Sequence, residues 1–270
     1  MPRSSSSRRS LARGVAALLI SWLVLVGGLV SSAIAQPRPL DVPYVPTPEH
    51  IVEAMLKLAK PGKDDFLVDL GCGDGRIPIM AAQKYGVRGF GVDMNPVRIK
   101  EARANAEKAG VSDKVQFIEG DLFKTDFQKA SVLTLYLLPQ VNMALRPSIL
   151  DMKPGTRIVS HAFHMEDWKA DATEQFDFRT IYHWVVPAKV AGRWVGTVAG
   201  AKVELDLVQK FQELTGTATI DGKSASVTAG KVMGDAIEVA LVQAGTAGLK
   251  MAAVLKGAAL EGDGVRLAKQ

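Results

Sequence analysis

The stretch that decides the fold is Val68–Arg76, with the sequence VDLGCGDGR. It follows an apolar strand pattern, Phe66–Leu70, and opens a helical pattern, Gly75–Tyr85. Glycines at every second position allow a sharp turn between strand and helix, and they let the backbone approach a ligand closely. The start of the helix adds free N–H groups that face such a ligand. The stretch therefore predicts the ligand-binding turn of an α/β fold.

Strand and helix patterns alternate on both sides of this turn. Thr47 and Pro48 are typical of an N-cap and a first helical residue, and the helix that they start extends to about Lys60. Further strands are predicted at 89–93, 115–119, 131–137 and 157–162, with helices at 96–109 and 141–151. This alternation predicts a Rossmann-like, doubly wound sheet with helices on both faces. The carboxyl ends of its parallel strands share one edge, where ligands bind.

After about Pro187 the pattern changes to short alternating strands separated by glycines. Strands are predicted at 194–198, 203–208, 218–220, 225–228, 237–242 and 248–255. Such spacing is typical of a small β-barrel or β-sandwich. We therefore divide the chain into an α/β domain, 36–188, and a C-terminal β module, 189–270. The sequence of the module contains no catalytic cluster, which favours a stabilising or docking role.

Residues 1–35 differ in composition from the rest of the chain. Arginines precede the apolar stretch Val15–Val30, and Ala33-Ile34-Ala35 provides the small residues that signal peptidase accepts. The pattern predicts a signal peptide and a periplasmic location, and Arg8-Arg9 is similar to the twin-arginine signal that the export machinery reads. An uncleaved anchor that faces the periplasm is an alternative, because residues 15–35 are long enough to span a bilayer. A cytoplasmic location also stays open.

The charge of the chain depends on this leader. The 270 residues contain 33 Lys and Arg against 28 Asp and Glu, a net charge of +5. Residues 1–35 contain four of the basic residues and no acid, which leaves 29 basic against 28 acidic residues. The chain beyond the leader is nearly neutral, so no nucleic acid is expected as a partner. The single cysteine excludes an intramolecular disulfide.

Acidic residues restrict the ligand of the glycine turn, which on its glycines alone fits nucleotides, flavins and sulfonium cofactors. Asp69 and Asp74 crowd the turn and disfavour a pyrophosphate, and Arg76 stands where the dinucleotide fingerprint has its third glycine. Asp93 ends the second strand, 22 residues after the first glycine of the turn, close to the spacing at which an acid reaches ribose hydroxyls. Asp121 follows the third strand and is placed to accept from an adenine amino group. These acids favour a cationic ligand.

In this combination the chain resembles the class I S-adenosylmethionine-dependent methyltransferases. The resemblance rests on the motifs DLGCGDG (69–75), GVDMN (91–95) and GDL (120–122), and it covers roughly residues 46–165. It implies that the glycines hold the methionine part of S-adenosylmethionine, with Asp69 near the ammonium group, Asp93 on the ribose and Asp121 on the adenine. Met94 either flanks the adenine or packs in the fold. The cofactor-binding residues implied in this way are Asp69, Gly71, Gly73, Gly75, Asp93, Met94, Asp121 and Leu122.

A narrower resemblance concerns the methyl acceptor. The segments YVPTP (44–48), GDGRI (73–77) and LPQ (138–140), with Asn95-Pro96, are similar to a group of small methyltransferases that includes bacterial relatives of mitochondrial protein-lysine methyltransferases. This similarity implies a lysine of a membrane-associated protein as acceptor. The leader and the C-terminal module depart from that group, which leaves the acceptor open.

The acceptor site is expected after the fourth strand, where class I enzymes place acceptor-binding residues. The candidates are Tyr136, Pro139 and Gln140, with a core aromatic as the alternative for Tyr136. His161 and His164 lack a convincing third ligand, so no metal site is predicted. Cys72 has no paired histidine in the sequence and is interpreted as a small packing residue.

Three functions compete at this point. The ordered motifs favour an enzyme that transfers the sulfonium methyl group to its acceptor by direct in-line displacement. The leader favours an exported, non-catalytic binding protein on the same scaffold, because S-adenosylmethionine is made in the cytosol. A nucleotide-dependent oxidoreductase is disfavoured by Arg76 and Asp121.

Overall fold

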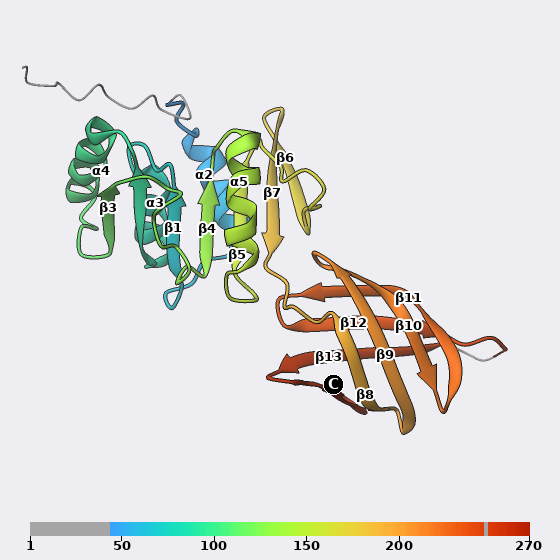
Figure 1. The fold of residues 1–270 in the computed structure, drawn as a ribbon. Coiled ribbons are helices and arrows are strands. Elements are labelled where there is room, and N and C mark those ends of the chain that lie inside the picture. Colours follow the sequence, from blue (N-terminus) through green and yellow to red (C-terminus); the bar gives the residue numbers. More distant parts are fainter. Residues whose placement is uncertain (1–43, 246–247) are drawn as a thin grey trace, which may run out of the picture. The chain divides into compact units, whose positions relative to one another are not determined.

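The computed structural model describes residues 44–245 and 248–270. The leader predicted at 1–35 lies outside the described residues. The described chain forms a seven-stranded mixed sheet flanked by helices, followed by a closed β-barrel (Figure 1). Within these residues, no helix combines the length and the apolar character that crossing a membrane requires.

Helices and strands alternate along the α/β domain as far as β5, except that β4 follows β3 without a helix between them. In chain order they are α2 (Glu49–Ala59), β1 (Phe66–Leu70), α3 (Arg76–Tyr85), β2 (Arg88–Asp93), α4 (Pro96–Lys108), β3 (Val115–Glu119), β4 (Val132–Leu135), α5 (Pro139–Leu150) and β5 (Arg157–His161), then β6 (Ala172–Phe176) and β7 (Arg179–Val185). The sheet order is β3-β2-β1-β4-β5-β7-β6. Strands β1 to β5 are parallel, and β7 lies antiparallel between β5 and β6.

This arrangement confirms the predicted doubly wound fold but adds the β6–β7 hairpin, which the sequence pattern did not reveal. Four of the five β6 residues are exposed, so the strand has no buried face to produce an apolar alternation. Its backbone is held by β7, which in turn pairs with β5.

Neighbouring residues of β1 point to opposite faces of the sheet and bind different helices there. Leu67 packs with Ile51 and Met55 of α2 in one buried cluster. Val68 belongs to another cluster, which includes Ile149 of α5. Because side chains alternate across a strand, this split places α2 and α5 on opposite faces. The sheet is therefore covered on both sides, which leaves its strand ends as the accessible edges.

Helix α2 starts one residue later than predicted and without the predicted cap. Pro48 occupies the N-cap position, and no side chain caps the helix. The Thr47 hydroxyl instead makes a buried hydrogen bond of 3.1 Å with Nδ1 of His161. The partner is 114 residues away in the sequence. Local sequence rules could not anticipate this contact, because it is a tertiary one.

Gly91 in β2 provides space for the turn that follows β1. The N–H groups of Gly71 and Cys72 both donate to the carbonyl of Val92, at 2.9 and 3.0 Å, so the turn folds back over β2. A Cβ atom at Gly91 would lie 2.5 Å from Cβ of the buried Cys72. Only a glycine at this position allows the turn to pack so closely.

We expect Gly91→Ala to lower the free energy of unfolding by about 1–3 kcal/mol, the usual cost of overpacking a core. Gly120→Ala is the matched control, since a Cβ atom there would meet its nearest neighbour at an ordinary 3.6 Å. Urea denaturation of the two variants measures the difference. Equal stabilities would contradict the proposed close packing.

The C-terminal module is a barrel, which decides between the two predicted architectures. Its strands are β8 (Gly192–Val198), β9 (Ala201–Lys210), β10 (Glu213–Ile220), β11 (Lys223–Met233), β12 (Ala236–Val242), β13 (Leu249–Lys256), β14 (Ala259–Gly262) and β15 (Val265–Lys269). Each pairs antiparallel with its chain neighbour, and β15 closes on β8. Buried side chains such as Trp194, Leu205 and Ile237 form one apolar cluster within it. Strands β14 and β15 are additional to the predicted ones.

Candidate active site

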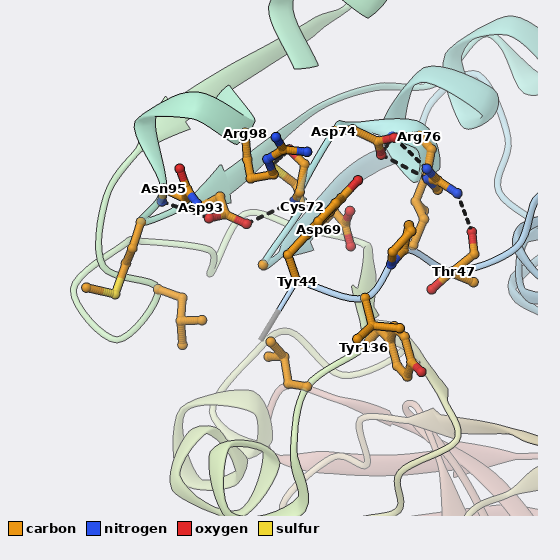
Figure 2. A pocket seen from close by; sticks show the side chains of 18 residues that line it. Tyr44, Thr47, Asp69, Cys72, Asp74, Arg76, Asp93, Asn95, Arg98 and Tyr136 are labelled. Atoms are coloured by element: carbon orange, nitrogen blue, oxygen red, sulfur yellow. Dashed lines mark hydrogen bonds and ion pairs between the residues drawn. The ribbon is translucent and has the colours of Figure 1, made fainter. Parts of the chain in front are cut away.

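A cavity opens at the carboxyl edge of the sheet, next to β1 and β4. This is the point at which the strand order reverses, where open α/β sheets bind ligands. The cavity is open to solvent, and the space between its lining residues, with the solvent at its mouth included, is about 860 Å³. It is lined by the segment 44–47, the turn after β1, the ends of β2 and β4, and the start of α4 (Figure 2). Of the residues predicted from the sequence, those that line it are Asp69, Gly71, Gly73, Asp93, Met94, Leu122 and Tyr136.

Two glycines shape the floor of this cavity. Gly71 and Gly73 have φ angles of 78° and 53°, in the left-handed region that favours glycine. A Cβ atom at Gly71 would lie 2.8 Å from Cδ2 of Leu137, and one at Gly73 would lie 2.6 Å from Cε2 of Tyr44. Both the backbone conformation and the available space therefore require glycine, which brings the main chain close to any ligand.

Asp93 ties the glycine turn to the end of β2. Its Oδ2 accepts from the N–H of Gly73 at 3.0 Å. Its Oδ1 accepts from the N–H of Asn95 at 2.8 Å (Figure 2). One carboxylate thus organises two loops that line the cavity. Its lone pairs beyond these two bonds leave capacity to accept from ligand hydroxyls.

Asp69 is a carboxyl group buried beneath the cavity. Only 2% of the residue is exposed, and its Oδ1 accepts from the hydroxyl of Thr134 at 2.7 Å. Burial raises the pKa of Asp69 to about 7, and the charges of Asp93 and Asp74 contribute to the same rise. A cationic ligand would stabilise the ionised form of this group. The site therefore favours a ligand with a positive charge.

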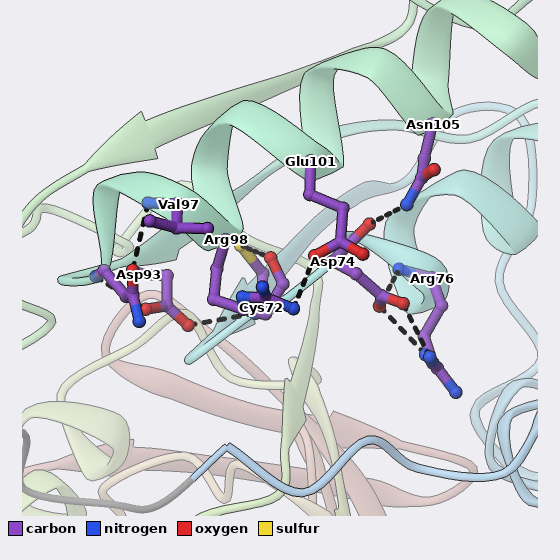
Figure 3. Close-up of polar contacts among 10 residues, drawn as sticks. Cys72, Asp74, Arg76, Asp93, Val97, Arg98, Glu101 and Asn105 are labelled. Atoms are coloured by element: carbon purple, nitrogen blue, oxygen red, sulfur yellow. Dashed lines mark hydrogen bonds and ion pairs between the residues drawn. The ribbon is translucent and has the colours of Figure 1, made fainter.

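Arg76 is engaged with the protein itself. Its Nε and Nη2 donate to the two carboxylate oxygens of Asp74 at 2.9 and 2.5 Å, and its Nη1 donates to the carbonyl of Thr47 at 2.9 Å. Burial raises the pKa of Asp74, but the hydrogen bonds and charge of Arg76 outweigh it and lower the pKa overall. Asn105 holds the Asp74 carbonyl at 3.0 Å (Figure 3). Arg76 thereby joins the segment before α2 to the glycine turn.

Tyr44 is a cavity residue that the sequence reasoning did not single out. Its ring lies against Gly73 and beneath the guanidinium of Arg98, which is 4.5 Å from the ring centroid. Arg98 in turn makes an ion pair of 2.5 Å with Glu101. Val45, Pro46 and Thr47 line the cavity beside it. The YVPTP motif was the available signal, although it served only to place the chain in a family.

The ring of Tyr136 forms the aromatic wall of the cavity at the end of β4. The rings of His161 and Phe163 do not line the cavity but pack against Tyr136, with ring centroids 4.0 and 5.9 Å away. The hydroxyl of Tyr136 accepts from Nη1 of Arg179 at 2.8 Å. His161 is fully buried, and its Nε2 has no hydrogen-bond partner among the described residues. Burial, followed by the charge of Arg179, lowers the pKa of His161 to about 4, so the imidazole is neutral at physiological pH.

Four predicted site residues do not line the cavity. Gly75 faces Phe117, whose ring a Cβ atom would meet at 2.6 Å, so this glycine serves packing. The carboxylate of Asp121 accepts from the N–H of Phe123 at 2.9 Å within its own turn, and only the adjacent Leu122 reaches the cavity. Pro139 and Gln140 begin α5 outside it. The spacing placed these residues at the correct edge, but it could not predict where their side chains point.

The other reactive side chains near the site are accounted for by packing and local hydrogen bonds. Cys72 is buried, and burial raises the pKa of its thiol well above the usual value, so the nucleophilic thiolate is disfavoured. Nδ1 of His164 accepts from the N–H of Glu166 at 3.0 Å. Throughout residues 44–245 and 248–270, no three His, Cys, Asp or Glu residues are grouped so as to hold a metal.

The sheet order, the glycine turn and the acid-lined cavity together define a Rossmann-like α/β protein with a ligand site at its switch point. Comparisons with known proteins show which family of this fold class the chain resembles. A family model described as the ANTKMT methyltransferase domain matches residues 69–172. A protein-lysine N-methyltransferase of Saccharolobus islandicus (strain REY15A) is 49% identical over 129 residues, which cover 47% of this chain and 80% of the relative.

Two further methyltransferases are also similar to this chain. The adenine nucleotide translocase lysine N-methyltransferase of Mus musculus is 36% identical over 135 residues, which cover 49% of this chain and 58% of the relative. The solved structure of an RNA methyltransferase from Salinibacter ruber, in complex with S-adenosyl-L-homocysteine, is 48% identical with a TM-score of 0.53, and covers 54% of this chain and 96% of that chain. The chain belongs to the class I S-adenosylmethionine-dependent methyltransferases, in the family related to protein-lysine N-methyltransferases.

The residues present fit S-adenosylmethionine as the cofactor. The glycine turn allows the methionine part of the cofactor to approach closely. A positively charged group of the cofactor beside the buried Asp69 would stabilise the negative charge of that carboxylate. Asp93 stands at the strand end where an acid meets ribose hydroxyls. The predicted enzyme class and cofactor are therefore confirmed, and the non-catalytic alternative receives no support. The roles of individual residues stay predictions.

Proposed function

We propose that this enzyme is a protein-lysine N-methyltransferase. The observation that carries the proposal is the uncharged aromatic wall made by Tyr136, with Phe163 and the neutral His161 against it. Of the three rings, Tyr136 is the one that lines the cavity, where its face suits the aliphatic stem of a lysine and can contact the ammonium group. The lysine N-methyltransferase activity in the names of the archaeal and mouse relatives supports the same acceptor class.

The residues of the wall also favour the reactive form of a lysine. A lysine must lose its proton before the nitrogen attacks, and both burial and a nearby positive charge lower the pKa of an amine. Tyr136 provides a partly buried surface, and Arg179 places a cation at its hydroxyl. When bound, S-adenosylmethionine supplies a methyl group that is already electrophilic, so the protein needs no nucleophile of its own. The chain's task is to align the amine and exclude water.

An RNA acceptor is the second candidate, because the Salinibacter ruber protein is described as an RNA methyltransferase. Phosphate groups require free cationic side chains. The two arginines that line the cavity, Arg76 and Arg98, are paired with Asp74 and Glu101. The chain beyond residue 35 is also nearly neutral. These charges favour a protein acceptor over RNA.

Methyl transfer to membrane proteins and to RNA from the same cell extract provides the test. We expect methyl-lysine in protein fractions and none in RNA, with mass spectrometry to locate the modified residue. Tyr136→Ala should lower kcat/KM at least about 10-fold through lost positioning, whereas Tyr136→Phe should retain most activity. The affinity for the cofactor should change little in both variants. Methylated RNA with unmodified protein would refute the proposal.

We also propose that residues 1–35 direct the chain to the membrane, either as a cleaved export signal or as an anchor. The support is the sequence alone: arginines, the apolar stretch Val15–Val30 and the small residues Ala33-Ile34-Ala35. N-terminal sequencing of a C-terminally tagged chain from fractionated cells decides between these forms. An intact N-terminus in the soluble cytoplasmic fraction would contradict both.

A further inference from the structure

Large apolar side chains are exposed around the mouth of the active-site cavity. We refer to six of them as the apolar rim: Tyr44, Val45, Val97, Phe123, Phe176 and Phe178. All six lie at the carboxyl edge of the sheet, on the segment before α2, the start of α4, the turn after β3 and the tip of the β6–β7 hairpin. Exposed apolar groups gathered at one functional edge indicate a contact surface.

Each rim residue either lines the cavity or lies close in the chain to a residue that lines it or contacts its lining. Tyr44 and Val45 line it, and Phe123 follows the lining residue Leu122. Val97 precedes the lining residue Arg98 on α4. The hairpin tip is connected through Arg179, whose guanidinium holds the Tyr136 hydroxyl. Whatever surface covers the rim therefore also meets the entrance of the active site.

Phe178 is the clearest member of the rim. It is fully exposed, at 107% of the reference area, and has a φ angle of 62°, while the preceding Asp177 has a φ angle of 47°. Both are in the left-handed region, which is costly for residues other than glycine. A contact of 2.6 Å between Nε2 of His50 and Oδ2 of Asp177 joins the tip to α2. The hairpin thus holds an aromatic ring out into solvent at a strained turn.

We propose that the apolar rim contacts the surface of a lipid bilayer and holds the mouth of the cavity against it. The rim consists of single apolar side chains on exposed turns and helix starts, which can enter the interface of a bilayer while the body of the protein stays outside it. The sequence also places the apolar stretch Val15–Val30 shortly before Tyr44, and in the anchor form of the leader this stretch would enter the same bilayer. The choice of a membrane-embedded acceptor rests on the proposed lysine activity and the use of Val15–Val30 on the proposed membrane leader, whereas the exposed rim rests on neither.

The test uses an environment-sensitive fluorophore attached to single introduced cysteines in the full chain. The rim variants are Phe178→Cys and Phe123→Cys, and the control is Val208→Cys on β9, an exposed apolar residue of the barrel. The native Cys72 is buried, and the unsubstituted chain measures its background labelling. Vesicles of phosphatidylethanolamine and phosphatidylglycerol are added, with and without nitroxide-labelled lipids. Binding of S-adenosyl-L-homocysteine confirms that each variant is folded.

We expect a blue shift and about a twofold rise in emission at positions 178 and 123, with quenching by the nitroxide lipids and no change at 208. No change at the rim positions, or an equal change at 208, would overturn the proposal. A change that requires an added membrane protein in detergent, and that vesicles alone do not produce, would also overturn it and assign the rim to a protein partner. None of these outcomes depends on methyl transfer, so they do not bear on the proposed lysine activity.

Discussion

Asp69→Asn is expected to weaken the binding of S-adenosylmethionine by about 10- to 150-fold. The same substitution is expected to stabilise the cofactor-free protein. The buried carboxylate has a pKa raised to about 7 by burial, so its ionised form is unfavourable until a cation lies beside it. The amide of an asparagine at this position carries no negative charge to pair with the cofactor's cation. A hydrogen bond to a charged group contributes about 1.5–3 kcal/mol, and this contribution to binding would be lost. Isothermal titration with the cofactor measures the loss.

The effect on stability has a definite sign. The folded pKa of Asp69 lies above its ordinary value of 3.8, so the folded state binds more protons than the unfolded state between about pH 4 and pH 7. Stability therefore falls as pH rises through this window, by up to about 4 kcal/mol for a shift of this size. Asp69→Asn should remove this dependence and be more stable than the parent at pH 8. The exposed Asp263→Asn is the control, and a pH profile unchanged by Asp69→Asn would contradict the assignment.

The second large effect is expected from Asp93→Ala. The substitution removes the acceptor for the N–H groups of Gly73 and Asn95, so the glycine turn loses one of its links to β2 and keeps only the backbone bonds to Val92. It also removes the acid that is predicted to hold the ribose. We expect the Kd for S-adenosylmethionine to rise by about 100-fold, the equivalent of two hydrogen bonds to a charged group at the weak end of their range. Asp93→Asn, which retains one acceptor, should have an intermediate effect.

Glu119→Ala is the matched control for this variant. Glu119 ends β3 directly beside Asp93 in the sheet register, but it is exposed and does not line the cavity. Adenosine then separates the two aspartates. It contains the ribose but no cationic group, so Asp93→Ala should weaken adenosine binding and Asp69→Asn should not. Equal losses of adenosine affinity in both variants would refute the assignment of the two acids to different parts of the cofactor.

These predictions concern one edge of the sheet, where four segments of the chain meet. The glycine turn, the end of β2 and the end of β4 converge because parallel strands share their carboxyl edge. The segment 44–47 reaches the same edge by tertiary contacts, through Arg76 to the Thr47 carbonyl and through Thr47 to His161. The cavity therefore depends as much on the first described residues as on the glycine turn.

The sequence was sufficient for the fold class and for the centre of the site. Alternating strand and helix patterns arise from local burial, and the turn at Gly71 and Gly73 uses a conformation that glycine adopts most readily. Asp69 and Asp93 could be placed at strand ends by spacing alone. For Asp121, Pro139 and Gln140 the same reasoning found the correct edge of the sheet and no more, because spacing along a strand does not determine the direction of side chains in the loops beyond it.

By itself the sequence determined a doubly wound sheet, a glycine turn with acids around it, and a β-rich module at the C-terminus. Only the tertiary structure decided that the module closes into a barrel, that Thr47 binds His161 instead of capping α2, and that Tyr44 and Tyr136 line the same cavity. It also placed six apolar side chains from separate segments around one entrance. The physical reason is common to all four: each depends on contacts between residues distant in the chain, and local propensities contain no information about which distant residues will meet.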